Sequence, residues 1–395
     1  MTLLDSPLVI ETGEAFPVCL DFRVSVSHHL KTREYTENVI VRLNSESGET
    51  GYGEGVPRDY ITGETPESAL ESLDRFLPTV AGRSFANTDE LIQALTTLGT
   101  SEEGTTHPTA VCAFELAALD LAGRFWDIPV GKLLGLPASS SPLSYNLVIP
   151  YFEDASLFLL LDQAVEFGFR QVKIKVTADD PAGRVRTIRE RLGDDVELRV
   201  DTNCAWDRSN APGFMRELAN LGVVSVEQPL ASDDIEGNRI LRGPGLPLVT
   251  LDESVRSVAD IDRIAALGAA DVINIRISKC GGLIHSLSMI EAAERHGLMV
   301  QMGAHVGESC ILSAAGVTLA AGYPAFRWLE GCFGTHLLTR DLTRQEYQFS
   351  AGGLFTPPVG AGLGVTIDED RIERAKASCS GRSGRVETCW MSDAN

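Results

Sequence analysis

Residues 196–253 carry the pattern that decides the fold: VELRVDTNCAWDRSNAPGFMRELANLGVVSVEQPLASDDIEGNRILRGPGLPLVTLDE. Three short apolar runs in it, VELRVD, VVSVEQP and PLVTLDE, each end at or near a carboxylic acid. These acids are Asp201, Glu227 and Asp252, spaced 26 and 25 residues apart. Such a spacing is one strand plus one helix of a parallel α/β fold. We therefore expect the three acids at the same end of three consecutive strands.

The same rhythm extends to both sides of this stretch. Eight apolar runs recur, and most gaps between them hold an amphipathic helix such as GRVRTIRERLG or VADIDRIAALG. The runs are residues 143–149, 171–176, 196–201, 223–229, 247–253, 271–278, 298–303 and 326–331. Eight strands alternating with helices predict an α/β fold, a parallel (β/α) barrel over residues 143–340. The helix after the eighth run is weak, so we expect a modified (β/α)8 TIM barrel of the (β/α)7β kind.

A different pattern precedes the barrel. Residues 8–56 alternate apolar and polar side chains between Ser and Gly turn signals, which predicts a β-meander. Helical spacing of apolar residues follows over 66–135. We therefore predict an α+β capping domain over residues 1–135. The Gly- and Pro-rich segment 341–372 is expected to return to this cap and complete it, and residues 373–395 to form a loose tail.

Composition excludes several classes of partner. The chain has 395 residues, a formal net charge of −21 and a pI near 4.7, which argues against binding nucleic acid or an anionic membrane. The first residues lack a secretory signal, and no long apolar run predicts a membrane span. The eight cysteines form no CxxC pair, so we expect free thiols in a reducing compartment and a cytoplasmic protein.

The three acids at strand ends predict a metal site. Carboxylates that converge at one mouth of a barrel repel one another unless a cation lies between them. Hard oxygen ligands suit Mg²⁺, or alternatively Mn²⁺, with water or substrate in the remaining positions. Asp201, Glu227 and Asp252 are therefore the predicted ligands. The alternative is that each acid caps the helix that follows its strand.

Lysines on two other runs predict acid–base chemistry. In QVKIKV, period-two alternation aims Lys173 and Lys175 at one face of the strand and Ile174 at the other. Lys279 follows the sixth run, and the second and sixth strands of a closed ring lie on opposite sides. Lys175 and Lys279 could thus face each other across a substrate. A free lysine has a pKa of about 10.4, and a nearby cation with partial burial can bring it to roughly 7–8, where it serves as a base. Salt bridges to the acids are the simpler alternative.

The ordered set of motifs resembles the enolase superfamily, and within it the muconate-lactonizing-enzyme subgroup of the mandelate racemase and muconate lactonizing enzyme family. The resemblance covers nearly the whole chain, including the cap and the returning segment GAGLGVTID. The matching motifs are Lys173-Ile-Lys175, Asp201-Thr-Asn203, Glu227-Gln-Pro, Asp252-Glu253-Ser, Lys279-Cys-Gly-Gly and Gly307-Glu308-Ser309.

This resemblance implies a common first step. Mg²⁺ on the three acids holds a substrate carboxylate, one lysine removes the α-proton, and the metal stabilises the enediolate. Lys175 is then the base, with Lys173 as an activating cation. Lys279 is either the acid or base on the other face or a cation beside the intermediate. Asn203 and Glu253 support the metal ligands.

The eighth run and the cap are expected to supply substrate contacts. Dipeptide epimerases of this subgroup carry an Asp-x-Asp pair on the eighth strand, which binds the substrate ammonium group. Here the stretch is Trp328-Leu329-Glu330, so only its second position is acidic. Glu330 could bind a cationic group, whereas Trp328 favours an apolar or stacking contact. The cap loop VPRDYITGET offers Arg58 and Tyr60, with a solvated loop as the alternative.

The segment GAHVGES after the seventh run supplies the last two candidates, His305 and Glu308. A mandelate-racemase-like His base would need an Asp partner one strand earlier, where Lys279 follows instead. We therefore expect His305 to be a structural or substrate-contacting residue, and Glu308 to contact substrate.

The leading prediction is an Mg²⁺-dependent isomerase, a racemase or epimerase that acts on a small carboxylate such as an amino-acid derivative or dipeptide. A lactonizing cycloisomerase, or a dehydratase like o-succinylbenzoate synthase, is the second reading of the same scaffold. A metal-free Schiff-base lysine enzyme, a barrel that only binds a ligand, and a homo-oligomeric state are left open.

Overall fold

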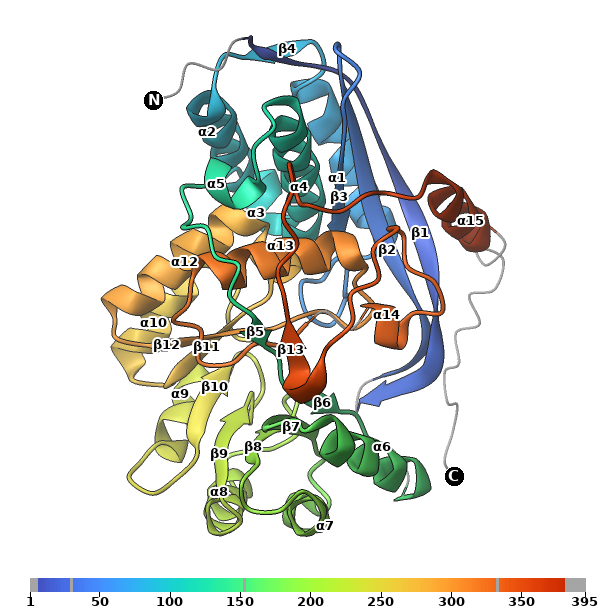
Figure 1. Ribbon diagram of the computed structural model, residues 1–395. Helices are drawn as coiled ribbons and strands as arrows, with labels where there is room; N and C mark the ends of the chain where they lie inside the picture. The colour runs from blue at the N-terminus through green and yellow to red at the C-terminus, as the bar shows by residue number, and fades with distance from the viewer. Residues whose placement is uncertain (1–5, 29–30, 152–153, 332–333, 381–395) are drawn as a thin grey trace, which may run out of the picture.

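An antiparallel sheet forms the N-terminal part of the chain, in agreement with the alternating pattern. The computed structural model describes residues 6–28, 31–151, 154–331 and 334–380. The strand order in this sheet is β3-β2-β1-β4. Its strands are β1 (Leu8–His28), β2 (Lys31–Ser45), β3 (Thr50–Gly55) and β4 (Arg83–Phe85). Figure 1 shows β1 and β2 as two long strands along one side of the molecule.

Strand β3 packs directly against the backbone of helix α4 (Pro108–Phe125), because glycines occupy every second position of the strand. A Cβ on Gly53 would lie 2.0 Å from the carbonyl oxygen of Ala113, and a Cβ on Gly51 would lie 2.3 Å from the amide nitrogen of Leu121. The helix is buried along nearly its whole length. The other helical segments here are α1 (Pro66–Phe76), a 3₁₀ turn (Leu77–Thr79), α2 (Thr88–Gly99), α3 (Glu102–Thr106) and α5 (Val130–Leu133).

A seven-stranded parallel sheet follows, curled into the predicted barrel. Its order, β12-β11-β10-β9-β8-β7-β6, is the order of the chain. The strands are β6 (Leu147–Ile149), β7 (Gln171–Lys175), β8 (Glu197–Asp201), β9 (Val223–Glu227), β10 (Leu248–Leu251), β11 (Val272–Ile275) and β12 (Met299–Met302). Part of the first predicted run forms the separate β5 (Leu143–Ser144), which pairs with β13 (Leu354–Phe355).

The eighth predicted run, 326–331, closes the ring without forming a regular strand. Met302 N donates to Trp328 O at 2.9 Å, and Glu330 N donates to Met302 O at 2.8 Å. On the other side, Asn146 N donates to Leu329 O at 2.9 Å. These bonds join β12 to the segment around β6. The (β/α)7β prediction is therefore confirmed in architecture, with the last member reduced to a bridge.

Helices cover the outside of the barrel, and short polar side chains start several of them. Asp180, Asp234 and Ser257 each accept a hydrogen bond from the first turn of the helix that follows. The helical segments are α6 (Asp154–Phe167), α7 (Pro181–Leu192), α8 (Ala211–Asn220), α9 (Ile235–Asn238), α10 (Val258–Leu267), α11 (Ile277–Cys280), α12 (Leu283–Arg295), α13 (Cys310–Gly322), α14 (Gly334–Leu337), and the 3₁₀ turns Arg239–Leu241 and Ala351–Gly353.

Two buried glutamates of the N-terminal part bind the first turns of barrel helices. Glu54 on β3 accepts hydrogen bonds from the amides of Ser309 and Leu312 at the start of α13. Glu115 on α4 accepts from the amide of Leu283 at the start of α12. Because the first amides of a helix have no partner within the helix, these contacts satisfy them and fix the cap on the barrel. The buried apolar residues form one cluster that runs through both parts.

The segment after the barrel returns to the cap, as predicted for residues 341–372. Leu363 N donates to Asp120 Oδ1 on α4 at 2.8 Å. The chain then forms helix α15 (Glu369–Ser380), which packs on β1, as Figure 1 shows at the right of the molecule. The predicted loose tail is therefore wrong for residues 373–380, because α15 buries Ile372 and Ala375 against the sheet. Residues 381–395 lie outside the described residues.

The cysteines also differ from the prediction. Cys19 on β1 and Cys379 on α15 form a disulfide, so these two are not free thiols. The pairing brings together residues separated by 360 positions. Four others are free, namely Cys112, Cys204, Cys280 and Cys310, while Cys332 and Cys389 lie outside the described residues. Within those residues, no helix is long and apolar enough to cross a membrane.

Candidate active site

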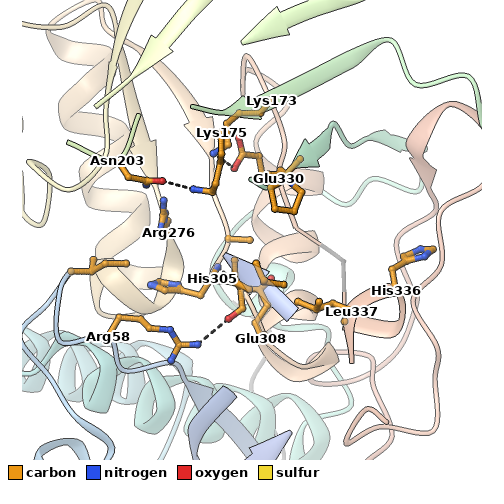
Figure 2. A pocket seen from close by; sticks show the side chains of 18 of the residues that line it. Arg58, Lys173, Lys175, Asn203, Arg276, His305, Glu308, Glu330, His336 and Leu337 are labelled. Atoms are coloured by element: carbon orange, nitrogen blue, oxygen red, sulfur yellow. Dashed lines mark hydrogen bonds and ion pairs between the residues drawn. The ribbon is translucent and has the colours of Figure 1, made fainter. Parts of the chain in front are cut away.

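A cavity of about 270 Å³ lies at the C-terminal mouth of the barrel, beneath the N-terminal sheet and its loops. The barrel contributes charged side chains from several strand ends. The cap contributes mainly apolar ones, including Val24, Val26 and Ile61. Figure 2 shows Lys173 and Lys175 entering from one strand, with Arg276, His305 and Arg58 on other walls.

The three predicted acids lie side by side at this mouth. Asp201 ends β8 and is paired in register with Glu227, which ends β9. Asp252 directly follows β10. Each is buried, with at most 2% of its surface exposed. Burial opposes ionisation of Asp201, but the ammonium groups of Lys175 and Lys173 outweigh it and hold its pKa below the usual range. Burial raises the pKa of Glu227 despite Lys173.

Both lysines of strand β7 reach these acids, as period-two alternation predicted. Lys175 Nζ donates to Asp201 Oδ2 at 2.9 Å and to Asn203 Oδ1 at 2.6 Å. Lys173 Nζ lies deeper, 2.6 Å from Glu330 Oε2, 3.3 Å from Glu227 and 3.4 Å from Asp201. Burial alone would lower the pKa of Lys173, but these carboxylates outweigh it and raise that pKa. Both lysines line the cavity.

Lys279 is not placed as predicted. It lies in the one-turn helix α11 after β11, and its side chain is fully buried. Its Nζ donates to Asp252 O and Oδ1, each at 2.8 Å, and to Asn274 O at 2.9 Å. These three acceptors satisfy the ammonium group behind Asp252. Lys279 therefore supports that carboxylate and does not face Lys175 across the cavity.

Arg276 occupies the wall where the second lysine was expected, and sequence reasoning missed it. Its guanidinium is ion-paired with the carboxylate of Asp252 and lies 3.8 Å from Glu227 Oε1. Burial would lower the pKa of Arg276, but Asp252 and Glu253 outweigh it and raise that pKa. Alternation was the available signal, because Asn274 on β11 and Arg276 share the inward parity. Burial would raise the pKa of Asp252, but Arg276 and Lys279 outweigh it and hold that pKa below its usual range.

The two candidates on the eighth run have separate surroundings. Glu330 lines the cavity, but its carboxylate is already bound by Lys173 and by Arg199, whose Nη2 lies 2.9 Å from Oε1. Trp328 is buried below it, and its Nε1 donates to Glu197 Oε1 at 2.5 Å. The Trp328 ring also stacks on Arg199. The predicted substrate contact of Trp328 is therefore wrong, because alternate inward residues of a barrel fill different layers.

The remaining substrate candidates do line the cavity. Arg58 and Tyr60 come from the cap loop, and His305 and Glu308 from the loop after β12. The Arg58 guanidinium donates to Thr36 Oγ1 at 2.7 Å and to Val306 O at 2.9 Å, and burial lowers its pKa to about 10.

Two of these wall residues are neutralised by their surroundings. Burial raises the pKa of Glu308 to about 8. Burial, together with Arg276 and Arg58, lowers the pKa of His305 well below its ordinary value. Both side chains are therefore largely uncharged at neutral pH.

A polar network behind the acids fixes the loops that carry them. Asn203, in a left-handed conformation with φ of 46°, donates to Glu253 Oε1 at 3.1 Å. Burial and Asp252 raise the pKa of Glu253 to about 7. Gln228, also left-handed with φ of 41°, accepts from the amide of Asp252 at 3.0 Å. Strained backbone of this kind concentrates at functional sites.

Comparison with known families covers nearly the whole chain. Residues 17–135 match the N-terminal domain of the mandelate racemase and muconate lactonizing enzymes, and residues 159–371 match the enolase C-terminal domain-like family. The chain belongs to the mandelate racemase/muconate lactonizing enzyme family of the enolase superfamily. The family assignment drawn from the motifs is thus confirmed.

Characterised members of this family that resemble the chain perform more than one reaction. It is 31% identical to the N-succinyl-L-Arg/Lys racemase of Bacillus cereus, over 85% of this chain and 89% of the racemase. It is 29% identical to muconate cycloisomerase 1 of Rhodococcus opacus, over 90% and 95% of the two chains. The structure of an Enterococcus faecalis dipeptide epimerase with Mg and L-Leu-L-Tyr has a TM-score of 0.82 and 27% identity, covering 91% of this chain and 99% of the epimerase.

The residues present fit a divalent cation by their chemistry. Within the described residues, no three His, Cys, Asp or Glu side chains are arranged as a ready metal cluster. Protein cations hold the carboxylates instead, and two of them bridge neighbouring acids: Lys173 lies between Asp201 and Glu227, and Arg276 between Glu227 and Asp252. All the donors are carboxylate oxygens, which Mg²⁺ prefers. The set of acids thus already holds positive charge, and solved structures of two related dipeptide epimerases contain Mg.

Proposed function

We propose that this protein removes the α-proton of a small carboxylate substrate, with Lys175 as the base and Asp201, Glu227 and Asp252 as ligands of Mg²⁺. A divalent cation in this position would bind the substrate carboxylate and stabilise the charge that develops on it. The observation that carries the proposal is the row of Lys175, Asp201 and Glu227, which are paired in register across three neighbouring strands. Lys175 is the member of this row that lines the cavity.

The neighbours of Lys175 give it a defined position. Asp201 Oδ2 and Asn203 Oδ1 hold its Nζ from one side, and the side chain is 14% exposed towards the cavity. Asn203 is in turn held by Glu253. A base oriented in this way loses little further freedom when it meets the substrate proton, which is the advantage of a preorganised site.

The charged side chains in the lower part of the site neutralise one another, so none of them needs a substrate group as its partner. Lys173 and Arg199 neutralise Glu330, so its carboxylate is a weak anchor for a substrate ammonium group. Around the entrance the lining is largely apolar, with Val24, Val26 and Leu337. These surroundings favour a carboxylate whose remaining part is apolar.

Two outcomes of proton removal remain candidates. Inversion at the α-carbon of an amino-acid derivative or dipeptide, the leading sequence prediction, is supported by racemase and epimerase relatives. A cycloisomerase or dehydratase reaction is favoured by one observation. Among the described residues the amines that line the cavity, Lys173 and Lys175, both come from β7, and the opposite wall carries Arg276.

Exchange of the α-proton with solvent deuterium tests the proposal. L-Leu-L-Tyr and N-succinyl-L-leucine are incubated in D₂O with Mg²⁺, and the loss of the α-proton signal is followed by NMR. We expect exchange that stops on adding EDTA and is absent in Lys175→Ala, since a positioned base contributes roughly 10²–10⁴-fold. Lys132→Ala, an exposed change on α5, serves as the matched control. Exchange that persists in Lys175→Ala or in EDTA would contradict the assignment.

A further inference from the structure

The cavity has an amine on one wall and a guanidinium on another. Lys175 projects from β7 and Arg276 follows β11, with β8, β9 and β10 between them in the ring. In an eight-membered barrel this spacing puts the two residues on opposing sides. Both line the same cavity, and Figure 2 shows them converging on it.

These two side chains differ in what they can do with a proton. A lysine amine can be neutral and accept a proton, whereas a guanidinium stays protonated and offers only donors. Arg276 can therefore stabilise negative charge on a substrate, but it cannot remove a proton from it. Lys279 does not supply the second base, because its buried ammonium group is already held by the carboxylate of Asp252 and by the backbone carbonyls of Asp252 and Asn274.

Four other titratable groups of the cavity are also poor second bases. The carboxylate of Glu330 is held by Lys173 and Arg199. Glu308 accepts hydrogen bonds from Ser313 Oγ and the amide of His305. A proton on the His305 ring would face the positive charges of Arg276 and Arg58. Glu253 lies beside Asn203, on the same side as Lys175.

We infer that this protein exchanges protons with its substrate on one face only, that of Lys175, while Arg276 holds charge on the other. This inference rests on the proposed function and deepens it. Inversion at a carbon needs proton donors or acceptors on both faces, so it is not the reaction. The substrate class is a carboxylate that loses its α-proton from Cα and loses or gains a bond to a second group at Cβ.

The chemistry of such a reaction balances without a further reagent. Lys175 takes the α-proton, and the C–H electron pair moves into the bond to the carboxyl carbon. When the carboxylate re-forms, the pair moves between Cα and Cβ and expels the leaving group from Cβ. The Lys175 ammonium then returns its proton to that group. The products are an unsaturated acid and the protonated leaving group, and the reverse direction is an addition or ring closure.

Stereochemical analysis of the exchange experiment tests this inference. L-Leu-L-Tyr and N-succinyl-L-leucine that have exchanged in D₂O are separated on a chiral column. We expect deuterated material of unchanged configuration, with no inverted product. Arg276→Lys places an amine on the second wall and should turn the ratio of inversion to exchange from zero into a measurable value, since one acid–base group is worth roughly 10²–10⁴-fold. Arg276→Met, which adds no amine, should leave the ratio at zero.

Wild-type inversion at a rate similar to exchange would overturn the inference, and its loss in His305→Gln would then identify the second base. A second measurement needs no substrate. Reductive methylation in the presence of Mg²⁺, read by peptide mass spectrometry, should modify Lys175 and leave Lys279 unmodified until the protein is unfolded. Modification of Lys279 in the folded protein would also overturn the inference. If neither probe exchanges, the proposed function fails for these substrates and the labelling result decides the inference alone.

Discussion

Replacing Lys279 with methionine separates a structural role from a catalytic one. Methionine has an unbranched side chain of similar length. It leaves Asp252 O, Asp252 Oδ1 and Asn274 O without the ammonium group that binds all three in the wild-type protein. Breaking a buried ion pair by removing one partner costs about 3–5 kcal/mol. The entropy of unfolding is about 2.1 cal/mol/K per residue, so 395 residues give roughly 0.8 kcal/mol/K and a fall in Tm of about 4–6 °C.

Differential scanning calorimetry measures this shift. The scans are run in EDTA, because the chelator removes any stabilisation by bound metal. Lys175→Met is the matched control. Its ammonium is partly exposed, so water replaces the lost contacts and the fall in Tm should be smaller. A Lys279→Met protein with the wild-type Tm and no α-proton exchange would refute this reasoning, since it would make Lys279 a catalytic group in a fold that does not need it.

Three further changes test other parts of the structure. Gly53→Ala should destabilise the protein by about 1–3 kcal/mol or more in urea unfolding, because the new Cβ meets the backbone of α4. Gly213→Ala is the control: its new Cβ meets nothing within 4 Å, so the same measurement should show equal or higher stability. Cys19→Ser should lower the free energy of unfolding by about 2–5 kcal/mol, and dithiothreitol should do the same to wild type but not to the variant. Burial raises the pKa of Glu115 to about 8 from 4.5, so the folded state binds the proton more tightly; its contribution is complete below about pH 4.5 and is lost as the pH rises through 8. The Tm should therefore fall across this range, and the fall should be shallower in Glu115→Gln; an equal slope in both proteins would reject this origin.

The barrel and its acids were predictable because they follow from repetition. A strand-plus-helix unit of fixed length places Asp201, Glu227 and Asp252 at one mouth whatever the loops between them do. Alternation within QVKIKV was enough to aim Lys173 and Lys175 correctly. Both arguments use local geometry that every parallel barrel shares.

The error at Lys279 came from placing it at the end of the sixth strand, although the segment that carries it has already stopped being a strand. Strand β11 ends at Ile275, and a single helical turn then carries Lys279 behind Asp252. Parity from Asn274 would have selected Arg276. Trp328 and Glu330 share a parity as well, but alternation does not tell which layer of the barrel interior each one fills.

Features that depend on distant partners could not be predicted. Nothing near Cys19 in the sequence indicates Cys379, because the two meet only after cap, barrel and returning segment are in place. The same holds for Glu54, whose hydrogen-bond donor Ser309 N, at the start of α13, is 255 positions away in the sequence.

The link between the first strand and the last helix turns most of this polypeptide into a covalent ring. Everything from Cys19 to Cys379, the whole barrel included, lies inside the loop that it closes. A protease that cut any single exposed turn within that loop would open the ring without releasing a fragment. The two pieces would stay tethered and would separate only under reducing conditions.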